Sequence, residues 1–106
     1  MMSQTPQPPY YAVIFTSTMS DNNKGYSEMS EKMDALAEQQ EGFLGQDTAR
    51  SEIGVSVSYW KDLESIKKWK ENAEHQLAIS MGRKQWYQSY NVRIAKVERE
   101  YGFERA

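Results

Sequence analysis

The chain has no cysteine and only one histidine, His75, among its 106 residues. Disulfide bonds, thiolate nucleophiles and cysteine-ligated metals are therefore excluded, and a single imidazole leaves little for a histidine-based metal site. The chain also lacks a phosphate-binding glycine loop and a serine–histidine–acid order. Hydrolase, kinase and nicotinamide chemistries thus have no support, and we expect neither a metal nor a cofactor.

Basic clusters and long apolar runs are also missing. Thirteen basic residues stand against fifteen acidic ones, which gives a net charge of −2. Because Lys and Arg cluster only in pairs, nucleic acid is not an expected partner. No apolar run is long enough to span a bilayer, and the start, MMSQTPQPP, lacks the basic and apolar regions of a signal peptide. We expect a cytoplasmic protein with no membrane partner.

The length suits a single domain, and 39% hydrophobic residues are enough for a core. All three prolines lie in the first nine residues, where they favour extended, solvated backbone. The sequence therefore predicts a flexible arm over residues 1–9 and one domain over residues 10–106.

The hydrophobic pattern predicts six elements. Residues 10–18 are aromatic and β-branched on both faces, which is typical of a covered strand, and apolar spacing over residues 26–40 predicts an amphipathic helix. Two β-like runs, 43–51 and 53–61, favour a hairpin. Asp62 is placed to cap a second helix, and residues 90–103 predict a last strand. The order β-α-β-β-α-β is typical of the α+β, ferredoxin-like fold, with four antiparallel strands and both helices on one face.

One strand carries hydroxyls on alternate residues. Ser56, Ser58 and Trp60 alternate with apolar residues, so either the small hydroxyls leave space for a ligand inside the fold, or the serines face water. The helices can cover only one face of the sheet, and the apolar residues on the other face lead us to expect a homodimer that packs sheet to sheet.

Several segments together resemble the antibiotic biosynthesis monooxygenase superfamily of dimeric α+β barrels: EGFLGQDTAR, WKENAEH and GRKQWYQSYNVRIAKVEREYGF. The similarity runs from about Tyr10 to Phe103 and is greatest to small bacterial proteins of that superfamily. It implies a dimeric α/β barrel and a cofactor-independent monooxygenase that acts on a small aromatic or polyphenolic molecule between sheet and helices.

Relatives that oxidise polycyclic phenols use an asparagine, a tryptophan and a tyrosine. By resemblance, Trp69 corresponds to the tryptophan, Ser65 stands near the place of the asparagine, and His75 stands near the place of the tyrosine. An imidazole can accept a phenolic proton near neutral pH, so His75 is the candidate catalytic residue. The haem-degrading relatives fit less well, because their first-strand asparagine is missing between Tyr10 and Asp21 and His75 follows Trp69 too closely.

Two structural alternatives concern Trp69 and His75. Six residues place them roughly 120° apart on a continuous helix, so they share a pocket only if the helix bends near Asn72 or the pocket wraps around it. His75 also fits a solvent-facing helix surface, and Trp69 also fits the core.

The remaining candidates are substrate-binding residues. Arg50 or Arg83 could hold an anionic group or lie exposed, and Trp86 could contact a ligand or pack beside Tyr87 and Tyr90. The full set of predicted substrate-binding residues is Trp69, Ser58, Trp60, Arg50, Arg83 and Trp86. Besides the monooxygenase, the pattern leaves open a non-catalytic dimeric module, related to small-molecule binding or stress.

Overall fold

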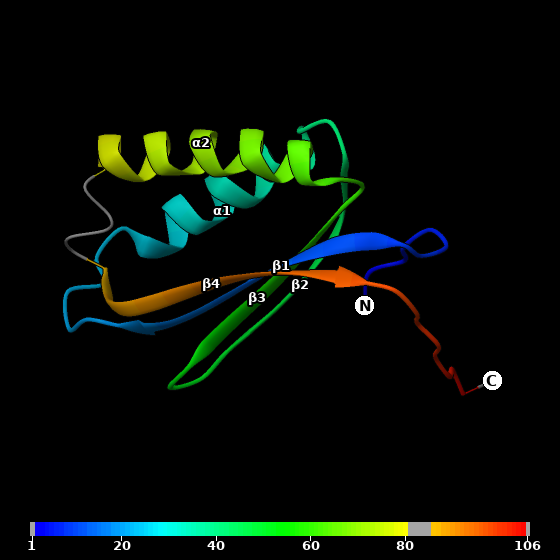
Figure 1. The fold of residues 1–106 in the computed structure, drawn as a ribbon. Coiled ribbons are helices and arrows are strands. Elements are labelled where there is room, and N and C mark those ends of the chain that lie inside the picture. Colours follow the sequence, from blue (N-terminus) through cyan, green and yellow to red (C-terminus); the bar gives the residue numbers. More distant parts are fainter. Residues whose placement is uncertain (1, 81–85, 106) are drawn as a thin grey trace.

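In the part of the chain that the structure describes, four strands and two helices follow one another in the order that the sequence predicts (Figure 1). The computed structural model describes residues 2–80 and 86–105. Strand β1 spans Tyr10–Met19, whose β-branched and aromatic residues favour extended backbone. The other elements are helix α1 (Tyr26–Glu38), strands β2 (Phe43–Arg50) and β3 (Gly54–Trp60), helix α2 (Leu63–Ser80) and strand β4 (Tyr87–Val97).

The strands form one antiparallel sheet in the order β2-β3-β1-β4. Figure 1 shows both helices on the same side of this sheet. The ferredoxin-like α+β fold is therefore confirmed. The last strand begins earlier than the sequence predicts, because Tyr87 already lies opposite Met19, and it ends at Val97, which lies opposite Tyr10, the first residue of β1. Beyond that point β1 offers no further pairing partner.

Helix α2 begins where the sequence predicts it. The carboxylate of Asp62 accepts a hydrogen bond of 2.8 Å from the backbone N–H of Ser65, which satisfies one free amide of the first turn. Bonds from the Ser65 side chain and backbone also lower the pKa of Asp62. The helix is then unbroken past Asn72 and runs straight in Figure 1, without the bend considered for that position. Among the described residues, neither helix is long and apolar enough to cross a bilayer.

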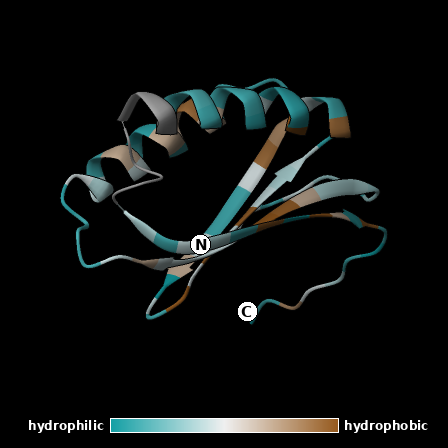
Figure 2. Cartoon of the chain, turned by 60° about the vertical axis from the view of Figure 1, so that its left-hand side comes forward, coloured by the Kyte–Doolittle hydropathy of each residue, from teal (hydrophilic) through white to brown (hydrophobic). Residues whose placement is uncertain are grey.

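The core lies between the sheet and the helices. Trp60 at the end of β3 has no exposed surface, and Ile66 of α2 and Ala37 of α1 are 4% and 3% exposed. Leu63 shares the helical apolar spacing of Ile66 and Trp69, yet this side chain at the start of α2 is 53% exposed. Hydrophilic residues occupy most of α2 in Figure 2, as expected for a helix with one face in water.

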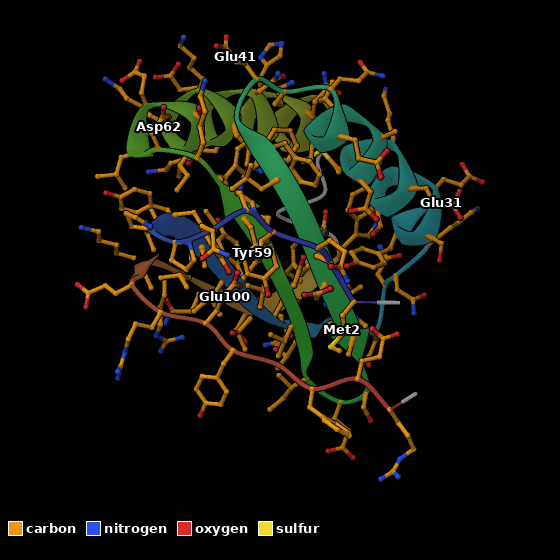
Figure 3. The ribbon with its side chains drawn as sticks, turned by 90° about the vertical axis from the view of Figure 1, so that its right-hand side faces the viewer. Met2, Glu31, Glu41, Tyr59, Asp62 and Glu100 are labelled. Carbon is orange, nitrogen blue, oxygen red and sulfur yellow. The ribbon has the colours of Figure 1, made fainter. Side chains whose placement is uncertain are left out.

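The N-terminal segment contacts the far side of the sheet. The backbone N–H of Ser3 donates to the carboxylate of Asp47 at 2.8 Å, and its hydroxyl donates to the Gln46 carbonyl at 2.8 Å. Tyr59 donates to the other Asp47 oxygen at 3.0 Å. Figure 3 shows Tyr59 and Glu100 on this side, next to the N-terminal segment. Part of the outer face is therefore covered by the chain itself.

Candidate functional site

A cavity of about 370 Å³ lies between the sheet and the two helices. Strand register explains its floor: Val13 of β1 lies opposite Ser58 and Ile94, and residues two apart along a strand point the same way. The side chains of the sheet that reach it are Val13, Phe15, Gln46, Thr48, Arg50, Ser56, Ser58, Tyr87, Tyr90, Val92 and Ile94, and those of the helices include Tyr26, Met29, Met33, Ile66, Trp69 and Glu74.

One end of the cavity is built from indole rings. Trp69 of α2 lines the cavity and stacks on Trp60, with ring centroids 5.9 Å apart and an angle of 23° between the planes. The ring of Phe43 also packs edge-on against Trp60, with ring centroids 5.4 Å apart. The Trp60 N–H donates to the hydroxyl of Ser58 at 2.9 Å, so the buried indole is satisfied and its orientation is held. Trp69 thus presents a supported flat ring to the cavity.

The middle of the floor is polar. The Gln46 amide donates to Ser56 at 2.9 Å and to Thr48 at 3.2 Å, and the hydroxyls of Ser56 and Thr48 lie 3.2 Å apart. The same amide reaches Asp34 of α1 at 3.2 Å. The hydroxyl-bearing side of β3 therefore faces the helices and the cavity, which is the first of the two arrangements considered for Ser56 and Ser58.

The opposite end combines a guanidinium group with phenols. Arg50, at the end of β2, donates to the hydroxyl of Ser17, and its guanidinium carbon lies 5.6 Å from the ring centroid of Tyr26. Tyr87 lies edge-on to Tyr26 at 5.7 Å. Burial raises the pKa of Tyr87, and its hydrogen bond with Tyr26 adds to this effect. Tyr87 is therefore neutral near physiological pH.

Trp86, Tyr87 and Tyr90 form the compact aromatic group that the sequence suggested, and the structure adds Tyr26 and Phe15 to it. The Trp86 N–H donates to the Lys24 carbonyl at 2.7 Å, and its ring lies 5.9 Å from that of Tyr26. Rings of Phe15 and Tyr90 stack at 5.5 Å. Trp86 is 5% exposed, yet it borders the cavity. The Trp86 side chain therefore packs mainly against its neighbours, and the part that borders the cavity is available to a ligand.

The predicted site residues separate into three groups in space. Trp69, Ser58, Arg50 and Trp86 line the cavity, and Trp60 lies directly behind Trp69. His75 is exposed and does not line the cavity, whereas Glu74 does. The continuous α2 accounts for this, because residues six apart point in different directions. Arg83 lies outside the described residues.

Ser65, which resemblance placed near the asparagine of the phenol-oxidising relatives, does not line the cavity. It is 7% exposed and packs against Gly42, so closely that a side-chain carbon at residue 42 would overlap with it. Its position in the first turn of α2, next to the Asp62 cap, directs it towards the loop before β2. A polar partner for a ligand therefore comes from the floor of the cavity instead.

The sequence analysis did not identify Gln46 and Thr48 in the polar floor of the cavity. It also did not identify Ser17 and Tyr26, which contact Arg50. Gln46 and Thr48 alternate along β2 just as Ser56 and Ser58 alternate along β3, and this period-two pattern was a usable signal. No local pattern connects Ser17 or Tyr26 with Arg50, because the three come from different elements. Within residues 2–80 and 86–105, no group of three or more His, Cys, Asp or Glu residues could hold a metal ion.

Comparison with known proteins identifies relatives along nearly the whole chain. Residues 13–96 match the family model described as monooxygenase af470-like. A curated Bacillus subtilis (strain 168) protein, the uncharacterized protein YqjZ, is 49% identical over 105 residues, which are 97% of this chain and 92% of that protein.

Two solved structures show the same fold. SnoaB, a cofactor-independent oxygenase from Streptomyces nogalater, has a TM-score of 0.71 at 10% identity, covering 88% of this chain and 97% of SnoaB. A Nitrosomonas europaea protein, provisionally named an antibiotic biosynthesis monooxygenase, has a TM-score of 0.66 at 13% identity and covers 89% and 94%. The family match covers most of the domain, so this chain belongs to the monooxygenase af470-like family.

Proposed function

We propose that the protein is a cofactor-independent monooxygenase that oxidises a small aromatic or polyphenolic molecule in the cavity between the sheet and the helices. The observation that carries this proposal is the shape of the cavity, where the supported ring of Trp69 faces a floor of amide and hydroxyl groups. A flat apolar wall with a few polar groups is what a phenolic ring needs for stacking and orientation. Family membership adds to this argument.

The proposed chemistry balances without a bound cofactor. A phenol and O₂ give a quinone and water: one oxygen atom enters the ring carbon as a carbonyl, the other leaves as water, and the substrate supplies all four electrons. Removal of the phenolic proton makes the ring electron-rich, so that it can transfer an electron to O₂. The protein then has three tasks: it binds the ring, accepts a proton and excludes bulk water.

Trp69 is the residue to test first, because it presents the ring wall. Oxygen consumption and product formation would be measured with a panel of naphthols, anthrones and hydroquinones, using the wild type and Trp69→Ala. We expect turnover of at least one member and a fall of kcat/KM by about fivefold or more in the variant, since an aromatic contact is worth ~1 kcal/mol beyond its area. Leu63→Ala, at an exposed position of the same helix, is the matched control. An equal fall in both variants would contradict the proposed role of Trp69.

The catalytic role of His75 stays a prediction, and its exposed position sets up a direct test. A general base must lie within hydrogen-bond reach of the proton it removes, directly or through one water. Glu74, the next residue, lines the cavity, whereas His75 does not. A 100-fold loss of kcat in His75→Gln alone would support His75 as the base. The same loss in Glu74→Gln alone would assign proton transfer to the carboxylate.

The exposure of His75 also favours a second candidate function. In this alternative the same cavity binds a small hydrophobic metabolite without chemistry, as a non-catalytic binding or stress-related module. Calorimetry with the phenol panel separates the two functions, because the binding module gives saturable heat with no oxygen uptake. Oxygen uptake that depends on Trp69 would exclude it.

A homodimer belongs to both proposals. By strand alternation, the pairs Ile14–Val57 and Thr16–Val55 belong to the outer face, beyond the part that the N-terminal segment contacts. Val55 is 38% exposed and also borders the cavity. Exposed apolar surface is unfavourable in water, so we expect a second copy of the chain to cover this area. Size-exclusion chromatography with light scattering should give twice the mass of one chain. Val55→Lys should shift the protein towards the monomer, and a wild-type monomer would contradict the proposal.

The expected cytoplasmic location also stays a prediction, to be checked by cell fractionation.

A further inference from the structure

Arg50 crosses the strand next to its own to reach the centre of the sheet. In the register, Arg50 lies opposite Gly54 of β3, and Gly54 lies opposite Ser17 of β1. The guanidinium passes over Gly54 and donates to the Ser17 hydroxyl. A side-chain carbon at residue 54 would overlap with the guanidinium group. Because the backbone of Gly54 has no positive φ, a side chain here would displace the arginine and would not strain the backbone.

The guanidinium is also held from a second side. Tyr26 of α1 places its ring 5.6 Å from the guanidinium carbon, and Tyr26 is itself braced edge-on by Trp86 and Tyr87 at 5.9 and 5.7 Å. Ser17 is only 2% exposed, so its hydroxyl is a fixed anchor. A long, flexible side chain thus has one defined position against the cavity wall.

Arg50 nevertheless has no carboxylate partner among the residues that the structure describes, where the ion pair within 4.0 Å joins Lys61 and Glu41. The Ser17 hydroxyl occupies one donor of the guanidinium fork, which has five in all. The side chain stays exposed and lines the cavity. A positive, pre-positioned fork with free donors is suited to a planar carboxylate, which it can bind through two parallel hydrogen bonds.

We propose that Arg50 is a specificity-determining residue that binds the carboxylate of an aromatic acid, and that Ser17 and Gly54 are positioning residues for its guanidinium group. This inference rests on the proposed ligand cavity. Ser58 lies four positions after Gly54 along β3, which is about 13 Å at ~3.3 Å per residue. A ligand anchored at Arg50 therefore extends its rings over the polar floor towards Trp69.

Calorimetric titration with 2-naphthoate and its neutral counterpart, 2-naphthamide, tests the inference. We expect the wild type to bind the acid at least about 10-fold more tightly than the amide, in line with a charge-assisted contact. Arg50→Gln should remove this preference by weakening the binding of the acid much more than that of the amide. Gly54→Ala should also remove it, because the added methyl group displaces the guanidinium, and Ser17→Ala should reduce it several-fold. Lys70→Gln, which changes another cation at the cavity, should keep the preference.

The ratio of acid to amide affinity distinguishes positioning from folding. A variant that merely loosens the fold weakens both ligands together, and circular dichroism of each variant checks the fold independently. Equal binding of acid and amide by the wild type, binding of neither, or an acid preference that survives Arg50→Gln would overturn the inference. Tighter binding of 2-naphthyl phosphate than of 2-naphthoate would overturn its choice of carboxylate. An Arg50-dependent preference for the acid without any oxygen uptake would support this inference and contradict the proposed monooxygenase activity. Turnover of neutral phenols with no preference for the acid would support the monooxygenase activity and contradict this inference.

Discussion

Trp69 of α2 stacks on Trp60 of β3, with ring centroids 5.9 Å apart, and this contact joins the helix layer to the sheet beside the cavity. The two rings differ in exposure, since Trp60 is fully buried and Trp69 is partly exposed to the cavity. One ring therefore serves the core and the other is available to a ligand. The contribution of each ring to the free energy of unfolding can be measured separately.

We expect Trp60→Ala to destabilise the protein by about 3–5 kcal/mol, because a large cavity opens in a packed core. Trp69→Ala should cost only about 1–2 kcal/mol, because less apolar area is removed from water by folding. Urea unfolding followed by circular dichroism gives both values. Equal losses would mean that Trp69 is as much a core residue as Trp60 and would weaken its role as a ligand wall.

Gly42→Ala should be strongly destabilising. Gly42 has φ +88°, a left-handed conformation that costs other residues about 1–2 kcal/mol. The new methyl group would also overlap with Ser65 at the start of α2. We expect a loss of about 2–3 kcal/mol in urea unfolding. Gly102→Ala is the matched control, because nothing lies within 4 Å of that position, and it should leave the stability unchanged.

Asp47 makes the attachment of the N-terminal segment depend on pH. The N–H of Ser3 lowers the pKa of this carboxyl, with a further contribution from Tyr59. Since the folded pKa lies below the unfolded one, the stabilisation is fully present above the ordinary value of about 3.9 and is lost as pH falls through the folded pKa. Asp47→Asn should cost about 0.5–1 kcal/mol near neutral pH. The difference from the wild type should vanish in acid, and a constant difference would contradict this linkage.

Tyr59 should ionise late in an alkaline titration. Burial, followed by its hydrogen bond to Asp47, raises the pKa of Tyr59 from 10.0 to about 12. Because the folded pKa is the higher one, this contribution to stability is present below about pH 10 and is lost as pH rises through the folded value. Tyr87 also has a raised pKa, so the late part of the ultraviolet phenolate titration should lose the amplitude of one tyrosine in Tyr59→Phe. Loss of an early step instead would contradict the assignment.

Local sequence was sufficient for most of the fold. Period-two and helical spacing predicted the element order, and the Asp62 cap and the hairpin before Gly54 follow from short-range chemistry. Leu63 shows the limit of spacing, since a residue at the first position of a helix can follow the apolar stripe and still be 53% exposed. Such residues cannot be distinguished from core residues without knowing what lies opposite.

The candidate site, too, could be predicted only in part from the sequence. Trp69, Ser58 and Arg50 could be named from the sequence because their chemistry is visible in single segments, and the superfamily resemblance directed attention to α2. The sequence alone determined a ferredoxin-like chain with aromatic and hydroxyl-bearing strands. Only the tertiary structure decided that Trp69 lines a cavity while His75 does not, because a continuous helix turns them apart. It also decided that Arg50 passes over Gly54 to Ser17, since strand register brings Ser17 next to two residues that are far from it in the chain.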